Sequence, residues 1–466
     1  MAKQLIFQLG TNNWQRQGEF APGSGILHQA HHDCMNKSID NTTSFSVYPS
    51  RNQKQELLDA SEQPFVRIFP LEHDIPICES VSPVSTYRWH SMSEDEFAAY
   101  RKHLCDFCIT FIDEIEAKEG QHMTRAIAHH SFLNPVVICD VNTARVAAGK
   151  PAIPFSVFVH GTALKMFHLE LAKDNTTEFP MRFTPFVRTA IDGGSALAKA
   201  QNIFIISEAE RGKLLTAYPD LQTPIVLSPN GVNMLIFHPD AEKSREAVLA
   251  TLETKPYEGS GKSPQPVPSS PSFTHQVVFV GKFADWKRLD CLLGAAAIYE
   301  KRIEEAGESV VTIIAGSGPL ESQKLYMDMP EKLGLKNVYF IGPQPQPVLA
   351  DLYSTGSVGV FPSYEEPMGM VFIECMACGT PVIGADSGGP KDFVHPDVGA
   401  LVPEVPVFGE DTERFVSDLA ETIVSSLKEN WKKTKGETAL TLAQEKFSTL
   451  SQVKGMVKAW ANLAGR

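Results

Sequence analysis

Short apolar runs alternate with longer amphipathic segments along the 466-residue chain. The short runs are rich in β-branched and aromatic residues, which predicts strands, whereas the longer segments repeat their apolar positions at helical spacing. This alternation indicates a parallel sheet covered by helices. In the first half it predicts a long helix over Glu94–Lys118. The strands predicted there are Gln4–Leu9, Pro64–Phe69, Val136–Cys139, Phe155–His160 and Ile203–Ser207.

The same alternation begins again in the second half of the chain, where a helix is predicted over Leu289–Glu305. The strands predicted there are Val277–Val280, Val310–Ala315, Val338–Ile341, Val358–Phe361 and Thr380–Ala385. A single hydrophobic core rarely grows to this chain length, so two domains are expected. We therefore predict an α/β protein with two Rossmann-like domains, residues 1–235 and 236–450, followed by a helix over residues 451–466.

The segment Glu258–Thr274 is rich in glycine, serine and proline, a composition typical of flexible or polyproline-like sequence. It is either the linker between the two domains or a surface loop inside the second. The loop interpretation is favoured, because Asn230–Asp240 has the character of the crossover between the domains.

The composition of the chain disfavours some classes of binding partner. Hydrophobic residues make up 43% and charged residues 21%, which is ordinary for a soluble globular protein. The formal net charge of −13 argues against nucleic acid and against an anionic membrane surface. The first apolar run is too short for a signal peptide, and no stretch approaches the length of a membrane span. We therefore expect a cytoplasmic protein whose eight cysteines stay reduced.

Two Cys-x-x-Cys pairs, Cys105/Cys108 and Cys375/Cys378, invite a zinc interpretation. Both pairs lie in apolar, helix-like stretches, and no neighbouring residues complete either ligand set. Cysteine in such a stretch is often a small buried hydrophobic residue. We therefore expect neither a metal nor another cofactor.

Two glycine-rich segments match nucleotide-binding loops only in part. Gly259-Ser-Gly-Lys-Ser263 has the end of a phosphate-binding loop, but Pro256 stands where the full pattern needs a glycine. The surrounding sequence also lacks the strand and the helix that such a loop joins. Gly316-x-Gly318 lacks the third glycine of the dinucleotide-binding motif, so it is predicted to be a tight turn after a strand.

The densest chemistry lies in residues 361–390, where a strand is predicted to end, a polar loop carries Glu365 and Glu366, and an apolar helix follows Gly369. Ligands of open α/β sheets bind at the carboxyl ends of strands, and the start of a helix favours a phosphate. Glu374 stands in an almost wholly apolar run, where a carboxylate needs a partner. About 8 Å into the helix, it is suited to accept hydrogen bonds from ribose hydroxyls.

This segment resembles the donor-site motif of the GT-B glycosyltransferases of family four. The resemblance is carried by Glu366-x7-Glu374, with Pro367 and Gly369, and by the later Gly-Thr-Pro-Val and Gly-Gly-Pro. Further segments resemble motifs of the same family, and these are Phe279–Arg288, Ser228–Val232, Val159–Gly161 and Ala21–Ile26.

Three positions depart from the family pattern. Lys282 stands where arginine is more common, which keeps the charge but loses bidentate geometry. Met368 stands at a common phenylalanine and Ser24 at a usual glycine. The departure at Met368 affects details of the donor pocket and leaves the reaction class unchanged.

The resemblance implies a transferase with two domains that face a central cleft and a C-terminal helix that packs back on the first domain. It implies transfer of a hexose from a nucleotide-diphosphate sugar, with UDP as the default, to a hydroxyl acceptor, with retention of configuration and without a metal. The acidic composition favours a small, soluble acceptor. The catalytic residues would be His160, Lys282, Lys287 and Glu366. The donor-binding residues would be Gly23, Ser24, Gly25, Gly281, Met368, Gly369, Met370, Val371 and Glu374.

In these roles, Lys282, Lys287 and the backbone N–H groups of Met368–Val371 would stabilise the leaving diphosphate, and His160 would contact the sugar. Glu366 would orient that sugar. Two other functions share the fold: a non-catalytic nucleotide-sugar-binding protein, and another GT-B activity such as an epimerase or a phosphorylase. His129 and His130 either touch the acceptor or serve the structure alone.

Overall fold

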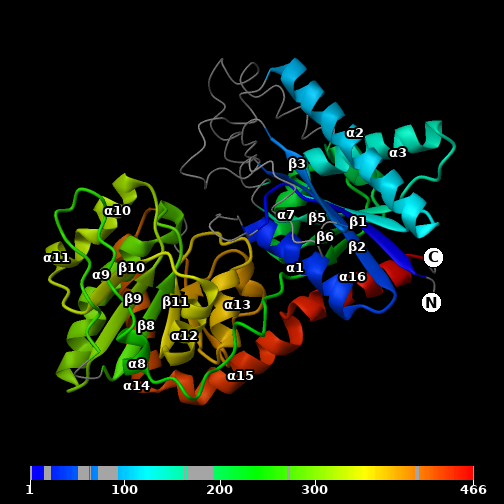
Figure 1. Ribbon diagram of the computed structural model, residues 1–466. Helices are drawn as coiled ribbons and strands as arrows, with labels where there is room; N and C mark the ends of the chain where they lie inside the picture. Colours follow the sequence, from blue (N-terminus) through cyan, green and yellow to red (C-terminus); the bar gives the residue numbers. More distant parts are fainter. Residues whose placement is uncertain are drawn as a thin grey trace. The chain divides into compact units, whose positions relative to one another are not determined.

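The computed structural model describes residues 3–14, 23–50, 62, 64–71, 93–161, 164, 193–269, 273–404 and 409–464. The chain forms two compact units. The first unit consists of Met1–Pro229 and Thr449–Arg466, and the second of Asn230–Ser448. Each unit is built on one parallel sheet with helices packed against it (Figure 1).

The sheet of the first unit has the strand order β3-β2-β1-β4-β5-β6-β7. The strands are β1 (Gln4–Leu9), β2 (Thr42–Ser50), β3 (Val66–Pro70), β4 (Arg125–His129), β5 (Phe155–Val159), β6 (Asn202–Ile205) and β7 (Ile225–Leu227). Every pairing is parallel, and β1, β4 and β5 are buried along almost their whole length, as expected for a sheet covered on both faces. The strand order reverses between β1 and β4, so the loops after these two strands diverge there.

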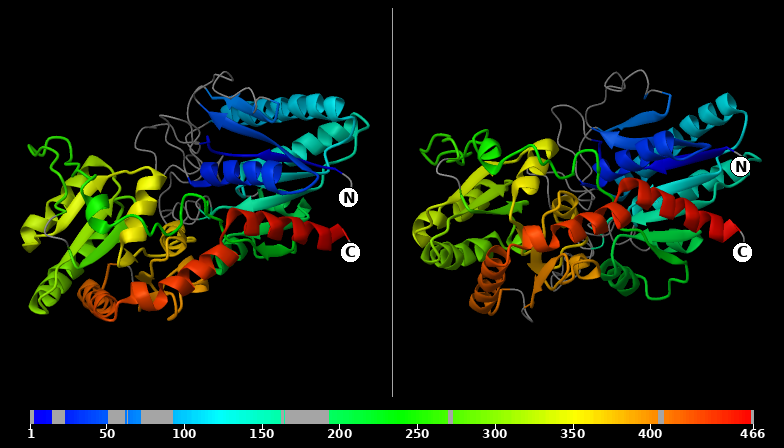
Figure 2. Two further views of the ribbon diagram at one scale, coloured as in Figure 1. Left: turned by 60° about the horizontal axis from the view of Figure 1, so that its bottom comes forward. Right: turned by 90° about the horizontal axis from the view of Figure 1, so that it is seen from below.

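The helices of the first unit include α1 (Gly23–Ser38), α2 (Glu94–Glu119), α3 (Leu133–Ala147), α7 (Glu208–Ala217) and α16 (Thr449–Ala464). A capping box of Ser93 and Glu96 begins α2, and the left-handed Gly120 ends it. The helices α2 and α3 pack side by side (Figure 1). The C-terminal helix α16, red in Figure 2, lies beside α1.

The sheet of the second unit has the order β10-β9-β8-β11-β12-β13, again all parallel. Its strands are β8 (His275–Val280), β9 (Val310–Ala315), β10 (Val338–Gly342), β11 (Val358–Phe361), β12 (Val382–Ala385) and β13 (Gly399–Val402). Its helices are α8 (Arg245–Leu249), α9 (Leu289–Glu305), α10 (Leu320–Met327), α11 (Met329–Leu333), α12 (Gln346–Thr355), α13 (Met370–Ala377), α14 (Thr412–Lys428) and α15 (Trp431–Lys446). Here the strand order reverses between β8 and β11.

The apolar runs that predict the strands become the cores of the two units. In β9, every residue is buried, and full burial of each of its valines and isoleucines contributes about 1.5–3 kcal/mol. No helix in the described part of the chain has the length and apolar character needed to cross a membrane.

The α/β class expected from the sequence is confirmed, and most predicted elements are found within a residue or two of their expected bounds. The strand predicted at Val136–Cys139 is wrong, because these residues lie inside α3. A short, fully apolar run looks the same in a buried strand and in a buried helix, so its periodicity cannot separate the two. The strands β2, β4, β7 and β13 were not predicted. In β2 the apolar pattern is interrupted by serine, threonine and proline.

The Gly/Ser/Pro-rich segment lies within the second unit, and Pro266 in its described part pairs with the residues before the segment, which contact β10. Glu253 pairs with Pro266, and the backbone N–H of Lys255 donates to the carbonyl of Phe340 in β10. This placement agrees with the loop interpretation of the segment.

Candidate active site

The loops after β8 and β11 leave the sheet of the second unit at the point where the strand order reverses. In open α/β sheets this is where ligands bind, because the two loops diverge and leave a crevice at the strand ends. Residues 281–288 follow β8, and residues 362–369 follow β11 and lead into α13. All of the donor residues predicted in the second half of the chain lie on these two loops or on α13.

Two of the predicted catalytic residues meet across these loops. The Lys287 Nζ lies 2.5 Å from the Glu366 Oε2, and their side chains are only 12% and 11% exposed. The ammonium group also lies 4.2 Å from the centre of the Trp286 ring. A backbone hydrogen bond of 2.7 Å from Tyr364 to Trp286 ties the two loops together. The pair therefore has a fixed place at the strand ends.

The loop that carries Lys282 is held by the Gly-x-Gly turn after β9. A Cβ atom on Gly316 would lie 1.8 Å from the Gly281 carbonyl oxygen, and one on Gly318 would lie 2.6 Å from that of Phe283. The Phe283 N–H donates to the carbonyl of Ser317 at 2.9 Å. These glycines therefore allow two strand-end loops to touch, in agreement with the predicted turn.

The Gly-Gly-Pro motif supports the loop that carries Glu366. The Gly389 N–H donates to the Glu366 carbonyl at 2.7 Å, and a Cβ atom on Gly388 would lie 2.3 Å from the same oxygen. Glu365 adopts a left-handed φ of 46°, and its N–H donates to the Ser387 Oγ at 2.8 Å. Such a conformation costs on the order of 1–3 kcal/mol and persists only where neighbours enforce it.

The first turn of α13 faces the same strand ends. Gly369 precedes it with a left-handed φ of 89°, and Met368 is buried. The leading N–H groups of a helix have no acceptor within the helix, and the helix dipole adds a partial positive charge there. Gly369, Met370 and Val371 therefore offer backbone donors suited to a phosphate.

Glu374 lies in α13 and is only partly exposed. Burial raises the pKa of its carboxyl group to about 7, against the opposing effect of the nearby Tyr353 hydroxyl. Tyr353 is fully buried, and its hydroxyl group has no hydrogen-bond partner among the described residues that meets geometric criteria. The group that lowers the pKa of Glu374 against the effect of burial is thus a phenol and not a cation.

In the first unit, the residues Gly23, Ser24 and Gly25 begin helix α1, where the sequence suggested a loop. Ala21, which opens that motif, lies outside the described residues. The Ser24 Oγ accepts a hydrogen bond from Asn12 at 2.7 Å. A Cβ atom on Gly25 would lie 2.0 Å from the Asn13 carbonyl, so this glycine lets the loop after β1 pack onto the helix.

His160 directly follows β5 and is 7% exposed. Its Nε2 lies 2.9 Å from the Nδ1 of His129, the last residue of β4, and the His130 ring lies 4.6 Å from its own ring. Burial lowers the pKa of all three histidines. The sequence singled out these residues but did not show that they touch. It missed Gln8, which bonds to His129, although a lone amide in an apolar strand was a usable signal.

The Cys-x-x-Cys pairs are buried in or beside helices. Burial raises the pKa of Cys105 to about 11 and that of Cys378 to about 12, which disfavours the thiolate that a metal needs. Within the described residues, no group of three or more histidine, cysteine or acidic side chains is arranged to hold a metal ion.

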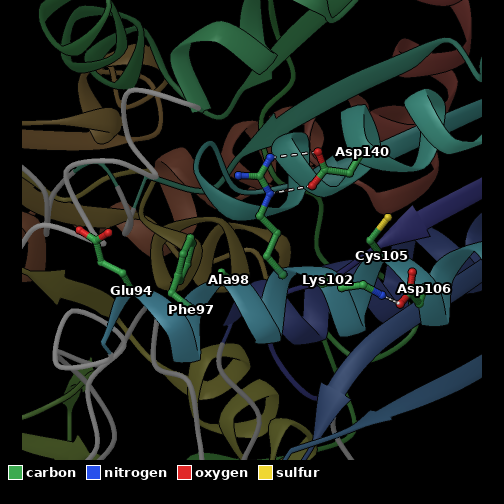
Figure 3. A pocket seen from close by; sticks show the side chains of 8 residues that line it. Glu94, Phe97, Ala98, Lys102, Cys105, Asp106 and Asp140 are labelled. Carbon is green, nitrogen blue, oxygen red and sulfur yellow. Dashed lines mark hydrogen bonds and ion pairs between the residues drawn. The ribbon is translucent and has the colours of Figure 1, made fainter.

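The described residues line two surface depressions, one in each unit. One, of about 410 Å³, lies at the carboxyl ends of β8, β9 and β10, beside the Lys282 loop, and its walls include Phe283, Ser317 and Gln323. The other, of about 370 Å³, lies on α2 and α3, where Lys102 pairs with Asp106 (Figure 3). None of the described residues lining the second depression is a predicted catalytic or donor-binding residue.

Residues 274–423 match the family model described as Glycosyl transferases group 1. A D-inositol 3-phosphate glycosyltransferase of Kribbella flavida is 28% identical over 346 residues, which are 73% of this chain and 72% of that protein. The same-named protein of Thermobispora bispora is 34% identical over 157 residues, 33% of this chain and 36% of that protein.

Solved structures agree with these matches at the level of the fold. The sucrose-phosphate synthase of Thermosynechococcus elongatus has a TM-score of 0.64 at 20% identity, covering 99% of this chain and 100% of that one. The HepE protein of Anabaena, solved with UDP and glucose, has a TM-score of 0.60 at 15% identity, covering 98% and 100%.

Two parallel α/β sheets with this likeness define a GT-B protein, as the sequence resemblance implied. The family match in its second unit and these relatives support a GT-B glycosyltransferase of family four. The chain is a glycosyltransferase of the nucleotide-sugar type.

Proposed function

We propose that the chain moves a hexose from a UDP-sugar to a hydroxyl group of a small acceptor, with retention of configuration and without a metal ion. The observation that carries this proposal is the buried Lys287–Glu366 pair at the strand ends, next to the start of α13. A cation, backbone donors and a carboxylate would then act together at the strand ends of the second unit.

The diphosphate of the donor would bind Lys282, Lys287 and the first N–H groups of α13. Preorganised positive charge at a developing phosphate anion is usually the largest catalytic contribution, and one such donor is worth roughly 3 kcal/mol. These groups would supply the charge that a metal supplies in other transferases. The leaving phosphate can itself accept the proton of the acceptor hydroxyl.

Glu366 would exchange partners when the donor binds. In the structure its carboxylate accepts from Lys287. A diphosphate that draws the Lys287 ammonium away leaves that carboxylate able to accept hydrogen bonds from hydroxyls of the sugar. Glu374 would accept from the ribose, and His160 would contact the sugar from the first unit.

The acceptor is proposed to be a small polar molecule that bears hydroxyl groups. The named acceptor of the relatives, D-inositol 3-phosphate, is of this kind and is the first candidate to test. A cytoplasmic location would fit such an acceptor and a nucleotide-sugar donor.

A donor panel tests the proposal. Purified protein is mixed with UDP-, GDP- and ADP-hexoses, with and without D-inositol 3-phosphate, and nucleotide release is followed. We expect turnover with a UDP-hexose, and NMR of the anomeric proton of the product shows retention. A Glu366→Ala variant should lose most of the turnover. Binding of a donor without any release would indicate a nucleotide-sugar-binding protein, and neither binding nor release would refute the transferase.

A further inference from the structure

Three buried polar side chains form a chain of hydrogen bonds across neighbouring strands of the first unit. Gln8 lies in β1, His129 ends β4 and His160 directly follows β5. The Gln8 Oε1 lies 3.1 Å from the His129 Nε2, and the His129 Nδ1 lies 2.9 Å from the His160 Nε2. None of the three side chains exceeds 7% exposure.

The amide of Gln8 has a defined orientation. Its Nε2 donates to the Ser44 Oγ at 2.7 Å and points to the Met35 Sδ at 3.7 Å. A thioether sulfur can accept a hydrogen bond but cannot donate one, so the NH₂ group of Gln8 faces Met35 and the carbonyl oxygen does not. The carbonyl oxygen of Gln8 therefore faces His129 and accepts a hydrogen bond from its Nε2–H.

The proton positions on the two rings follow from this orientation. His129 donates from Nε2 to Gln8, so in its neutral form its Nδ1 carries no proton. That bare Nδ1 can only accept, so His160 donates from Nε2. The neutral His160 ring then has an unprotonated Nδ1, for which the described residues offer no hydrogen bond.

The neutral state of both rings has a physical cause. Burial lowers the pKa of His129 and of His160 well below the usual value. Charged neighbouring histidines would lower it further: His28, His31 and His130 act on His129, and His130, His129 and His31 act on His160. No carboxylate contributes to either shift. A cluster of buried imidazoles without a counter-ion stays uncharged at neutral pH.

Two hydrogen bonds fix the backbone from which the His129 ring extends. The carbonyl oxygen of His129 accepts from the Asn134 Nδ2 at 2.9 Å and from the Thr11 Oγ1 at 3.3 Å. The rings of His129 and His160 lie 5.1 Å apart and are inclined by only 18°. A ring fixed in this way can pass the orientation of Gln8 on to His160.

We infer that Gln8 and His129 are positioning residues that fix His160 in the tautomer with a bare Nδ1, so that this Nδ1 accepts a hydrogen bond from a hydroxyl group of the donor sugar. The identity of the ligand as a sugar hydroxyl rests on the proposed function. The tautomer itself rests only on the hydrogen bonds within the first unit.

The tautomer can be measured without any turnover. Full-length protein labelled with ¹⁵N-histidine is studied by two-bond proton–nitrogen correlation, and His160 is assigned with a His160→Asn variant. We expect protons on the Nε2 of both His129 and His160, and a bare Nδ1 on both. A proton on the Nδ1 of His160, or a charged ring at pH 7, would overturn the inference whatever the protein catalyses.

A Gln8→Leu variant tests the function of the chain of bonds. It keeps the side-chain size and removes the acceptor, so His160 should populate both tautomers. The matched control is Gln452→Leu, which removes the same kind of buried bond from His31, at 2.9 Å, outside the chain. We expect kcat/KM for the donor to fall about tenfold in Gln8→Leu, the size of one hydrogen bond, and less than about twofold in the control.

Singly deoxygenated donor sugars separate positioning from general damage. In the wild-type protein one such donor should react about tenfold more slowly, because His160 loses its hydroxyl partner. The difference in rate between the full and the deoxygenated donor should be smaller in Gln8→Leu. It should be larger in His129→Gln than in His129→Phe. UDP affinity, which depends on the second unit, should stay unchanged in every variant that folds. An unchanged difference in rate in Gln8→Leu, with an altered tautomer, would contradict the role.

Discussion

Glu374 combines two demands that oppose each other. It sits in an apolar helix face, where its charge is costly, and burial raises its pKa to about 7. Under the proposed function its ionised carboxylate accepts hydrogen bonds from ribose hydroxyls. Donor binding and protein stability would then respond to the same pH range.

A Glu374→Gln variant should separate these two effects. The native carboxyl keeps its proton to higher pH than the unfolded chain does, so the wild-type protein loses stability as the pH rises from about 4.5 towards 7. At pH 8 the variant should gain about 1–3 kcal/mol in free energy of unfolding, and at pH 4.5 almost nothing. Urea unfolding at both values measures this, and an equal gain at both would exclude the carboxyl as the cause.

The donor affinity of the wild-type protein should weaken as the pH falls below about 7, since only the ionised Glu374 can accept hydrogen bonds from both ribose hydroxyls. Calorimetry with a UDP-sugar between pH 6 and 8 would show it. The Glu374→Gln variant should bind weakly at every pH, without this slope.

Lys287 is the residue whose charge the proposed reaction needs most. A Lys287→Met variant keeps the chain length but removes the cation, and it should lower kcat about 100-fold or more. Lys391→Met is the control, because this lysine is exposed and pairs only with Asp386, at 3.3 Å. Steady-state kinetics measures kcat for both variants. A similar decrease in kcat in the two variants would indicate a general effect of charge.

At the scale of elements, the glycines show how strand-end loops support one another. The motifs Gly316-x-Gly318 and Gly388-Gly389 pack against the loops of Lys282 and Glu366. The loops after β8 and β11 are thus each supported by a glycine turn that follows the neighbouring strand, β9 or β12.

A Gly316→Ala variant tests this support. Its Cβ atom would lie 1.8 Å from the Gly281 carbonyl, so one of the two loops must move, and donor affinity should fall at least about tenfold by the loss of a contact of hydrogen-bond strength. Gly307→Ala is the control, because Gly307 also has a positive φ, of 76°, but open space around it. Its cost should be limited to backbone strain of about 1–2 kcal/mol, with donor affinity unchanged.

On the scale of the whole molecule, the last residues of the chain form part of the same unit as the first residues. Helix α16 belongs to the first unit, where Trp460 donates to the Ser156 Oγ at 2.9 Å and Gln452 bonds to His31. The first unit is therefore finished only after the second has been synthesised. Its stability depends on residues separated by more than 300 positions in the sequence.

A Trp460→Ala variant should destabilise the first unit by about 3–5 kcal/mol, since it empties a buried aromatic site. Hydrogen exchange followed by mass spectrometry reads each unit separately. Protection should fall in β5 and β6 and persist in β8 and β9. Leu450→Ala, at a more exposed site on the same helix, should change little, and loss of protection in both units would contradict the assignment of α16 to the first.

The sequence by itself determined the α/β class, most of the elements and the family motif, because these depend on periodicity and on residues close together in the chain. Glu366 and Glu374 are separated by eight positions, so their joint placement at a helix start follows from local rules. Tertiary structure alone decided that Lys287 pairs with Glu366, that Gln8 orients His129 and His160, and that residues 136–139 are helical. These facts depend on which strands lie side by side, and long-range packing sets that arrangement.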